Sequence, residues 1–152
     1  MKEFLENFVR LRRALSQAHA LGLKPLGIGP LQAAILRALA QGGPCSAVEL
    51  ARATASDPAA INRAVGALIK KRLLRQRVDP RDARRCRLSL TPGSGRRMAA
   101  RTLGLSEELA RATVAVLSPA ELGRLNRGLK ALADHVTAHP QLLLKPIEAP
   151  DA

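Results

Sequence analysis

Apolar residues recur along this chain at helical spacings of three and four residues, and one central stretch departs from that period. The first apolar stripe consists of Phe4, Phe8, Leu11, Leu15 and Ala18. It predicts an amphipathic helix that ends near Gly22. A second helix is expected to begin at Gly29-Pro30 and to end at Gly42-Gly43, because proline at the first helical position loses no amide donor that the helix needs.

Capping residues predict two more helices in close succession. Ser46 and Glu49 have the spacing of a capping box, in which side chains satisfy the free backbone amides of a helix start. After a break at 54–56, Asp57-Pro58 supplies an N-cap followed by proline, so another helix begins there. Its buried stripe is expected to be Ile61, Val65 and Leu68, with Asn62, Arg63, Gly66 and Lys70 facing outward.

From Leu74 the period changes to that of strands, and two short strands are expected at 75–78 and 87–90. Between them, residues 79–85 are predicted to form a basic, turn-rich connection. Thr91-Pro92 is expected to cap a long fifth helix, with the stripe Leu105, Leu109, Ala112 and Val116. A second capping box, Ser118 to Glu121, begins a sixth helix that ends at His139-Pro140.

Positive charge is concentrated in one part of the chain. The 152 residues have a net charge of +13, and residues 58–97 alone contain twelve Lys or Arg against two Asp, a local net charge of +10. Such a concentration indicates a polyanionic partner. Hydrophobic residues make up 47% of the chain and are mostly aliphatic, which favours helices. We therefore expect a single domain, mainly α-helical with about six helices and a small β-hairpin.

Motifs for catalysis are missing from the sequence, which contains no Gly-rich phosphate loop, no Gly-x-Ser-x-Gly and no His-Glu-x-x-His. We expect a protein that is not an enzyme and that needs no cofactor or metal. The N-terminus is charged throughout, unlike a signal peptide, and no apolar run approaches the roughly 20 residues of a membrane span. A cytoplasmic location without membrane contact is the expectation.

Residues 46–91 combine a short helix, a tight break, a capped helix and a basic hairpin, an arrangement typical of a winged helix-turn-helix. The second helix of such a motif lies in the DNA major groove and presents its N-terminal residues to base edges. Its N-terminus also offers unpaired amides to a phosphate. Arg84 or Arg85 at the hairpin tip can enter the adjacent minor groove. The sequence therefore predicts binding to double-stranded DNA.

The segment SAVELARATASDPAAINRAVGALIKKRLLRQRVDPRDARRCRLSLTPGSGR, residues 46–96, resembles the MarR family of transcriptional regulators. The most specific part is Asp-Pro-Arg-Asp-x-Arg at 79–84, followed by Leu-Ser-Leu-Thr at 88–91. The flanking helices follow the order of the family. The resemblance implies a winged-helix dimer with dimerisation helices at 1–29 and 117–152, a DNA-binding lobe at 30–97 and a connecting helix at 98–116.

The resemblance also implies a set of DNA contacts. The family's wing arginine falls on Arg84, and the acidic residue that orients it falls on Asp82. Lys70 and Lys71 either contact phosphates or favour the dipole of a helix end. The base-reading positions of the family fall on Pro58, Ala59, Ala60, Asn62 and Arg63. The complete set of expected contacts is Ser46, Ser56, Asp57, Pro58, Ala59, Ala60, Asn62, Arg63, Lys70, Lys71, Arg81, Asp82, Arg84 and Arg85.

The chain departs from the family pattern at three positions. Ala59 and Ala60 stand where many members have hydroxyl residues, which leaves base hydrogen bonding mainly to Asn62 and Arg63. Arg72 stands where relatives usually have a helix-ending glycine. A left-handed backbone at Arg72 would cost about 1 kcal/mol.

The terminal apolar stripes are too far along the chain from the central lobe to be buried there alone, and they predict a homodimer. Its contacts are expected from Phe4, Phe8, Leu11, Leu15, Leu122, Leu125, Leu129, Leu132 and Val136. Such a dimer would repress transcription by occupying a pseudo-palindromic operator. A small-molecule or oxidant effector between the dimerisation helices and the lobe would release it, and without Tyr or Trp its pocket would use aliphatic side chains with Arg or His.

Cysteines and histidines leave other roles open. Cys86 adjoins several arginines and Cys45 precedes a helix start, and both surroundings favour the thiolate and oxidant sensing; an incidental role is the alternative. His135 and His139 are one helical turn apart, and with His19 they allow a metal site or simply a polar helix end.

Two other functions fit a basic winged helix, namely RNA binding and interaction with a protein. Binding of single-stranded RNA relies on aromatic stacking, and the basic region contains no aromatic residue. A protein-interaction module would have a basic face without preference for an operator.

Overall fold

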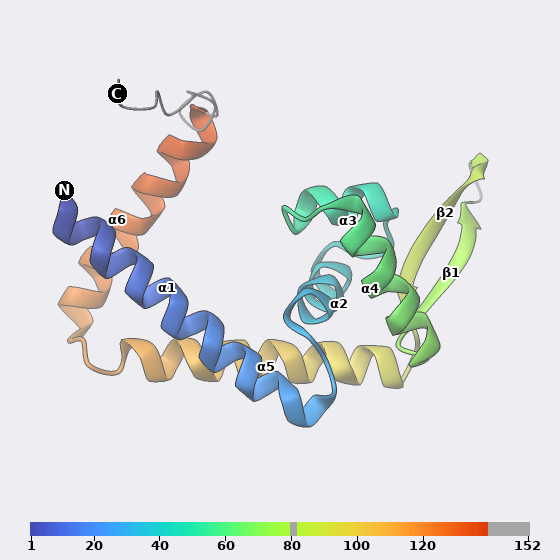
Figure 1. Cartoon of the computed structure of the whole chain (residues 1–152), viewed down its shortest axis with the longest axis horizontal. Helices are drawn as coiled ribbons and strands as arrows, with labels where there is room; N and C mark the ends of the chain where they lie inside the picture. Colours follow the sequence, from blue (N-terminus) through green and yellow to red (C-terminus); the bar gives the residue numbers. More distant parts are fainter. Residues whose placement is uncertain (80–81, 140–152) are drawn as a thin grey trace, which may run out of the picture. The chain divides into compact units, whose positions relative to one another are not determined.

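The computed structural model describes residues 1–79 and 82–139, and for residues 79 and 82–85 it describes the backbone alone. This part of the chain forms six α-helices and a two-stranded β-hairpin. Figure 1 shows their order along the chain. The chain divides into two compact units, Met1–Ala110 and Arg111–Ala152, which are described in turn. The expected class, mainly helical with a small hairpin, is confirmed.

Helix α1 (Lys2–Leu23) is amphipathic, but little of it is buried. Leu23 at its end is its one buried residue, whereas Phe4 and Phe8 are each more than half exposed, with their rings 6.1 Å apart between centroids. A 3-10 turn, η1 (Lys24–Leu26), follows, which the sequence did not predict. Gly27 ends it with a φ of 62°, a left-handed conformation that glycine adopts without strain.

The core of the first unit is built by α2 (Pro30–Gly42), α3 (Ala47–Ala53), α4 (Pro58–Lys70) and the hairpin. Each helix turns one apolar stripe inward. The largest fully buried aliphatic side chains are Leu23, Ile35, Leu36, Leu50, Ile61 and Leu68. Burial of one such side chain contributes about 1.5–3 kcal/mol. The helix starts predicted at Pro30, Ser46 and Asp57 are confirmed.

The turn between α3 and α4 is short and internally bonded. Ala55 has a φ of 47°, and the backbone amide of Ser56 donates to the carbonyl of Ala51 at 3.0 Å. The hydroxyl of Thr54 donates to the carbonyl of Leu50 at 2.7 Å. These bonds satisfy carbonyls at the end of α3, which have no partner within the helix. They fix the direction in which α4 begins.

After α4 the chain reverses at Arg72, whose φ of 56° places it in the left-handed region where related proteins usually have glycine. The carbonyl of Arg72 accepts hydrogen bonds from the hydroxyls of Thr91 (2.8 Å) and Ser94 (3.0 Å). A Cβ atom at Gly95 would lie well inside van der Waals contact with the carbonyl oxygen of Leu73. Glycine is therefore required where α5 meets the link between α4 and β1.

Strands β1 (Leu74–Asp79) and β2 (Asp82–Leu90) pair antiparallel, from Leu74 opposite Leu90 to Val78 opposite Cys86. The prediction of a turn over 79–85 is wrong for 82–85, which belong to β2. The register shifts between Val78 and Asp79, so that Asp79 lies opposite Asp82 and residues 83–85 have no partner in the described ladder. Cys45 adds a single bridge to Leu88, with N–H to O=C distances of 3.2 and 2.7 Å. This bridge was not predicted.

Helix α5 (Ser94–Val114) begins later than the predicted cap at Thr91-Pro92. Thr91 still takes part in the helix start, because its hydroxyl oxygen accepts from the backbone amide of Gly95 at 2.9 Å. Ala99 and Thr102 are its most buried side chains. Val116, predicted as part of the apolar stripe, lies beyond the helix and is 86% exposed, so that assignment was wrong.

The second unit contains α6 (Pro119–Ala138). Its predicted capping box is confirmed, since the amide of Ser118 donates to the Glu121 carboxylate at 2.9 Å and the amide of Glu121 donates to the Ser118 hydroxyl at 3.4 Å. The Ser118 hydroxyl also donates to this carboxylate at 2.6 Å, and this bond first, then the bond from the Ser118 amide, lowers the pKa of Glu121. No residue of α6 is buried. Among the described residues, no helix has the length and apolar character to cross a membrane.

Candidate nucleic-acid interface

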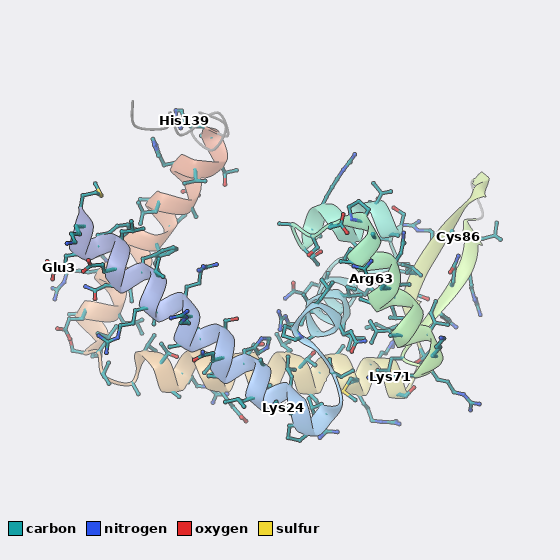
Figure 2. The ribbon with its side chains drawn as sticks, in the orientation of Figure 1. Glu3, Lys24, Arg63, Lys71, Cys86 and His139 are labelled. Atoms are coloured by element: carbon teal, nitrogen blue, oxygen red, sulfur yellow. The ribbon has the colours of Figure 1, made fainter. Side chains whose placement is uncertain are left out.

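Helix α4 has one buried face and one exposed face, as predicted. Ile61 and Leu68 are buried, whereas Asn62 and Arg63 are exposed near its N-terminal end (Figure 2). Gly66, predicted to face outward, is half-buried, because its position turns toward the edge of the core stripe. Two hydrogen-bonding side chains are thus available to a groove. The other expected base-reading residues are Pro58 and Ala59, which are exposed, and Ala60, which is half-buried.

The N-terminus of α4 is capped by Asp57, whose carboxylate accepts from the backbone amide of Ala60 at 2.9 Å. The predicted N-cap is confirmed, and it occupies the Ala60 amide, so that amide is not among those offered to a phosphate. A negative charge also stands at the positive end of the helix dipole. Asp57 acts here as a structural cap, and its contact with DNA stays a prediction.

Two serines expected to contact DNA are bonded within the protein. The hydroxyl of Ser46 donates to the Glu49 carboxylate at 2.8 Å and accepts from the Glu49 amide at 3.3 Å, which confirms the capping box. The hydroxyl of Ser56 donates to the carbonyl of Thr54 at 3.0 Å. Each serine helps to form the start or end of a helix, and their contacts with DNA stay predictions.

The two lysines at the end of α4 differ. The amine of Lys71 donates to the carbonyl of Gly27, so it ties the end of α4 to the link between α1 and α2 (Figure 2). Lys70 is exposed and has no hydrogen-bond partner among the described residues. Lys70 is therefore the better candidate for a phosphate contact.

The hairpin presents further arginines that sequence reasoning gave no role. Arg75 donates to the hydroxyl of Ser89 at 3.1 Å across the strands, and Arg87 donates to the carbonyl of Pro44 at 2.7 Å. Arg77 is exposed. The residues that lie opposite these arginines are known only once the register of β1 and β2 is known. Four predicted wing contacts lie outside the described residues or side chains: Arg81, Asp82, Arg84 and Arg85.

The two cysteines are free. Burial first, and then the Glu49 carboxylate, raises the pKa of Cys45, against a smaller opposite effect of Arg87. The prediction that its place before a helix lowers this pKa is wrong, because desolvation disfavours the thiolate. Cys86 is exposed on β2, and its proposed sensitivity to oxidants stays a prediction (Figure 2).

A cavity of about 540 Å³ lies among α1, α2 and α5 in the first unit. Arg37 donates to the hydroxyl of Ser106 at 3.0 Å, and its Nη1 lies 3.3 Å from Nε2 of His19. Burial first, and then Arg37, lowers the pKa of His19. The other residues around the cavity are Leu15, Ser16, Gln41, Leu103, Leu109 and Ala110. Sequence reasoning missed Arg37 and Ser106, although Arg37 is the one charged residue within α2.

His135 and His139 lie in the second unit, with ring centroids 4.6 Å apart. Nδ1 of His139 is 2.9 Å from the carbonyl oxygen of His135, which makes it part of the helix end. Within the described part of the chain, no three His, Cys, Asp or Glu residues form a group suited to a metal ion.

The predicted dimer contacts are mostly exposed. In the first unit, Phe4, Phe8 and Leu11 are each more than half exposed, whereas Leu15 is half-buried beside the cavity. In the second unit Leu122 is half-buried. The exposed stripe of α6 consists of Leu125, Leu129, Leu132 and Val136. Each unit thus exposes an apolar stripe.

Solved structures with this fold are numerous. A probable transcriptional regulator from Pseudomonas aeruginosa shares 34% sequence identity, with a TM-score of 0.66 over 80% of this chain and 93% of that one. BpsR of Bordetella bronchiseptica, described with regulation of its DNA binding by 6-hydroxynicotinic acid, shares 26% identity at a TM-score of 0.73 over 85% and 91% of the two chains. A mutant MarR from E. coli in complex with operator DNA has 22% identity and a TM-score of 0.72, over 84% and 92%.

Curated protein sequences gave no match. The sequence model of the MarR family, however, matches residues 26–85, which include α2, α3, α4 and β1. The capped pair α3 and α4, the hairpin after it and the relative at 34% identity agree with that match. The chain belongs to the MarR family of winged helix-turn-helix transcriptional regulators.

Proposed function

We propose that this regulator binds double-stranded DNA as a homodimer, with α4 in the major groove and the hairpin against the adjacent minor groove. The observation that supports this most is the exposed pair Asn62 and Arg63 on a capped helix, within a segment of net charge +10. Amide and guanidinium side chains match adenine and guanine edges in the major groove. The structure of the MarR mutant, which has the same fold and was solved in complex with operator DNA, supports DNA as the partner.

A dimer would place two α4 helices in successive major grooves, about 34 Å apart, on a pseudo-palindromic operator. Occupancy of that operator would exclude RNA polymerase and repress transcription. The exposed stripes that include Phe8 and Leu129 support the dimer, because isolated apolar side chains are common on a surface but regular stripes of them are not. The candidate operator is an inverted repeat in the DNA upstream of the gene.

The experiment compares a base contact with a phosphate contact on the same helix. Arg63→Ala should weaken operator binding by about 1–3 kcal/mol and relax the preference at one position of each half-site. Lys70→Ala should weaken binding to every duplex about equally. Each variant is titrated against the operator, a scrambled duplex and single-stranded RNA of equal length at one salt concentration. Equal losses on both duplexes for Arg63→Ala would contradict the role of α4, and preference for the RNA would contradict the whole proposal.

Salt dependence tests the basic segment separately. If a dimer neutralises about eight phosphates, the logarithm of the binding constant should fall with the logarithm of salt concentration at a slope of about −7. A slope shallower than about −3 would show that this segment does not face DNA.

We further propose that the cavity around Arg37 is the effector site. BpsR responds to 6-hydroxynicotinic acid, an organic acid, and this cavity combines one guanidinium with aliphatic walls from Leu15, Leu103 and Leu109. An organic carboxylate fits such surroundings, since its charge pairs with Arg37 and its apolar body contacts the leucines. To release the protein from DNA, the carboxylate must bind the DNA-free state more tightly than the DNA-bound state. We expect 6-hydroxynicotinate or benzoate to release the wild-type protein from the operator. Arg37→Gln should no longer respond to either compound. Release that persists in Arg37→Gln would place the effector site elsewhere.

A further inference from the structure

The polar groups at the centre of the cavity have defined donor and acceptor roles. The hydroxyl of Ser106 donates its one hydrogen to the carbonyl of Thr102 at 3.0 Å, so it accepts from Arg37. Nε2 of His19 lies 3.3 Å from Arg37 and 3.4 Å from the Ser106 hydroxyl. A guanidinium only donates, so the 3.3 Å contact with Arg37 is a hydrogen bond in the neutral ring that carries its proton on Nδ1.

We propose that His19 takes up one proton when an organic carboxylate binds beside Arg37, so that the effector response of this regulator depends on pH. The inference rests on the proposed effector site. A proton from the solvent would bind Nε2, the hydrogen bond from Arg37 to Nε2 would end, and the new N–H would donate to one carboxylate oxygen. The guanidinium would then bind the other carboxylate oxygen and keep its hydrogen bond to the Ser106 hydroxyl.

The charges around His19 support this coupling. From α1 the cavity is lined by Ser16 besides His19 itself, from α2 by Arg37 and Gln41, and from α5 by Ser106, so no carboxylate among the described residues lines it. In the free protein, burial first and then the guanidinium hold the pKa of His19 below its ordinary value, which favours the neutral ring. A bound anion reverses the local charge and raises that pKa. Binding and protonation must then strengthen each other by linkage.

The test measures benzoate binding to the full-length protein by calorimetry in two buffers of different ionisation enthalpy. Wild type should take up a fraction of one proton near pH 7, and its affinity should increase as the pH falls from about 8 to about 6, by at most about tenfold per pH unit for one linked proton. Benzamide, which has the same shape without the charge, should bind without proton uptake.

His19→Gln, which cannot titrate, should bind benzoate with an affinity that no longer changes with pH. The matched control is His135→Gln, in the second unit, which should keep the wild-type pH dependence. As a measurement without any variant, the Cε1 proton resonance of His19 should titrate at higher pH in the presence of benzoate than in its absence. This comparison decides the question even if His19→Gln does not fold.

The outcomes separate the two proposals. Benzoate binding without proton uptake, or with an unchanged His19 titration, would overturn the coupling and leave the effector site intact. No binding by wild type would overturn the effector site and, with it, the coupling. Neither result would affect operator binding, which is measured separately through Arg63→Ala.

Discussion

Helices α4 and α6 start in the same way and end up in different surroundings. Each begins with a side-chain N-cap followed by proline, and each has an amphipathic stripe. In α4, four residues of the stripe are buried within the lobe, whereas α6 has no buried residue and leaves Leu125, Leu129 and Leu132 between 42% and 51% exposed. The capping and periodicity signals are thus equally strong in the two helices. What differs is whether other parts of the same chain pack against the apolar stripe.

This contrast shows that the two helices are stabilised from different sources. Apolar contacts of α4 with the lobe come from the same chain and do not depend on concentration. An isolated helix is marginal in water, so α6 and the outer part of α1 require another apolar surface. In the proposed dimer a second copy of the chain would supply this surface, and the stability of these helices would then depend on protein concentration.

The largest effect should come from a charge in the stripe of α6. Leu129→Asp in both copies of a dimer removes two apolar side chains, each worth about 1.5–3 kcal/mol, and buries two unpaired carboxylates. We expect loss of the dimer at micromolar concentration in analytical ultracentrifugation. Arg127→Asp, on the opposite face of α6, is the control and should stay dimeric. A monomeric wild type, or a dimeric Leu129→Asp, would contradict the comparison.

A substitution of a core leucine tests the buried part of this comparison, the lobe. Leu36 is fully buried in α2, so Leu36→Ala should lower the free energy of unfolding by about 2–5 kcal/mol through lost burial and a cavity. Urea denaturation followed by circular dichroism measures it. Leu129→Ala made in a monomeric variant should cost less than about 0.5 kcal/mol, because its side chain is then exposed to solvent. Similar losses for both substitutions would remove the distinction between lobe and stripe.

Two glycines of α5 give a sharper comparison within one helix. Gly95→Ala forces a methyl group against the carbonyl oxygen of Leu73 and should destabilise the lobe by about 1–3 kcal/mol. Gly104→Ala meets no atom within 4 Å and should stabilise α5 by about 0.5–1 kcal/mol. Thermal unfolding of the two variants should therefore shift in opposite directions. A gain for Gly95→Ala would mean that α5 does not approach Leu73 so closely.

The smallest effect concerns the end of α4. Arg72→Gly should raise the stability of the lobe by about 1 kcal/mol, because glycine adopts the left-handed backbone at this position without strain. Lys70→Gly, at an ordinary helical position, should lower stability by about 1 kcal/mol. Equilibrium denaturation distinguishes them, and a loss on Arg72→Gly would show that its side chain contributes more than the strain costs.

Much of the fold was predictable because its signals are local. The caps at Ser46, Asp57 and Ser118 follow from residue type within a few positions. The 3-10 turn Lys24–Leu26 was missed although its closing bond, from the Gly27 amide to the Lys24 carbonyl, is local. The bridge between Cys45 and Leu88 was missed because it joins residues distant in sequence. The start of β2 at 82–85 was missed because turn-forming residues gave no sign that the strand extends beyond the regular pairing.

The candidate site was predictable to a smaller degree. Exposure of Asn62 and Arg63 follows from helical periodicity around Ile61. The tether from Lys71 to Gly27 and the cluster of His19, Arg37 and Ser106 do not, because each brings together residues from different helices. Periodicity assigns a residue to a face, and only tertiary packing decides what lies opposite.

The bridge from Cys45 to β2 has a mechanical consequence. Arg37 lies in the middle of α2, and the segment just after that helix is attached to the wing, by Cys45 to Leu88 and by Arg87 to the Pro44 carbonyl. Helix α2 also contacts α3 and α4. A small rotation of α2 about its axis would therefore move α4 and the β-hairpin together. A ligand at Arg37 need not reach the DNA surface to change the spacing at which that surface meets two grooves.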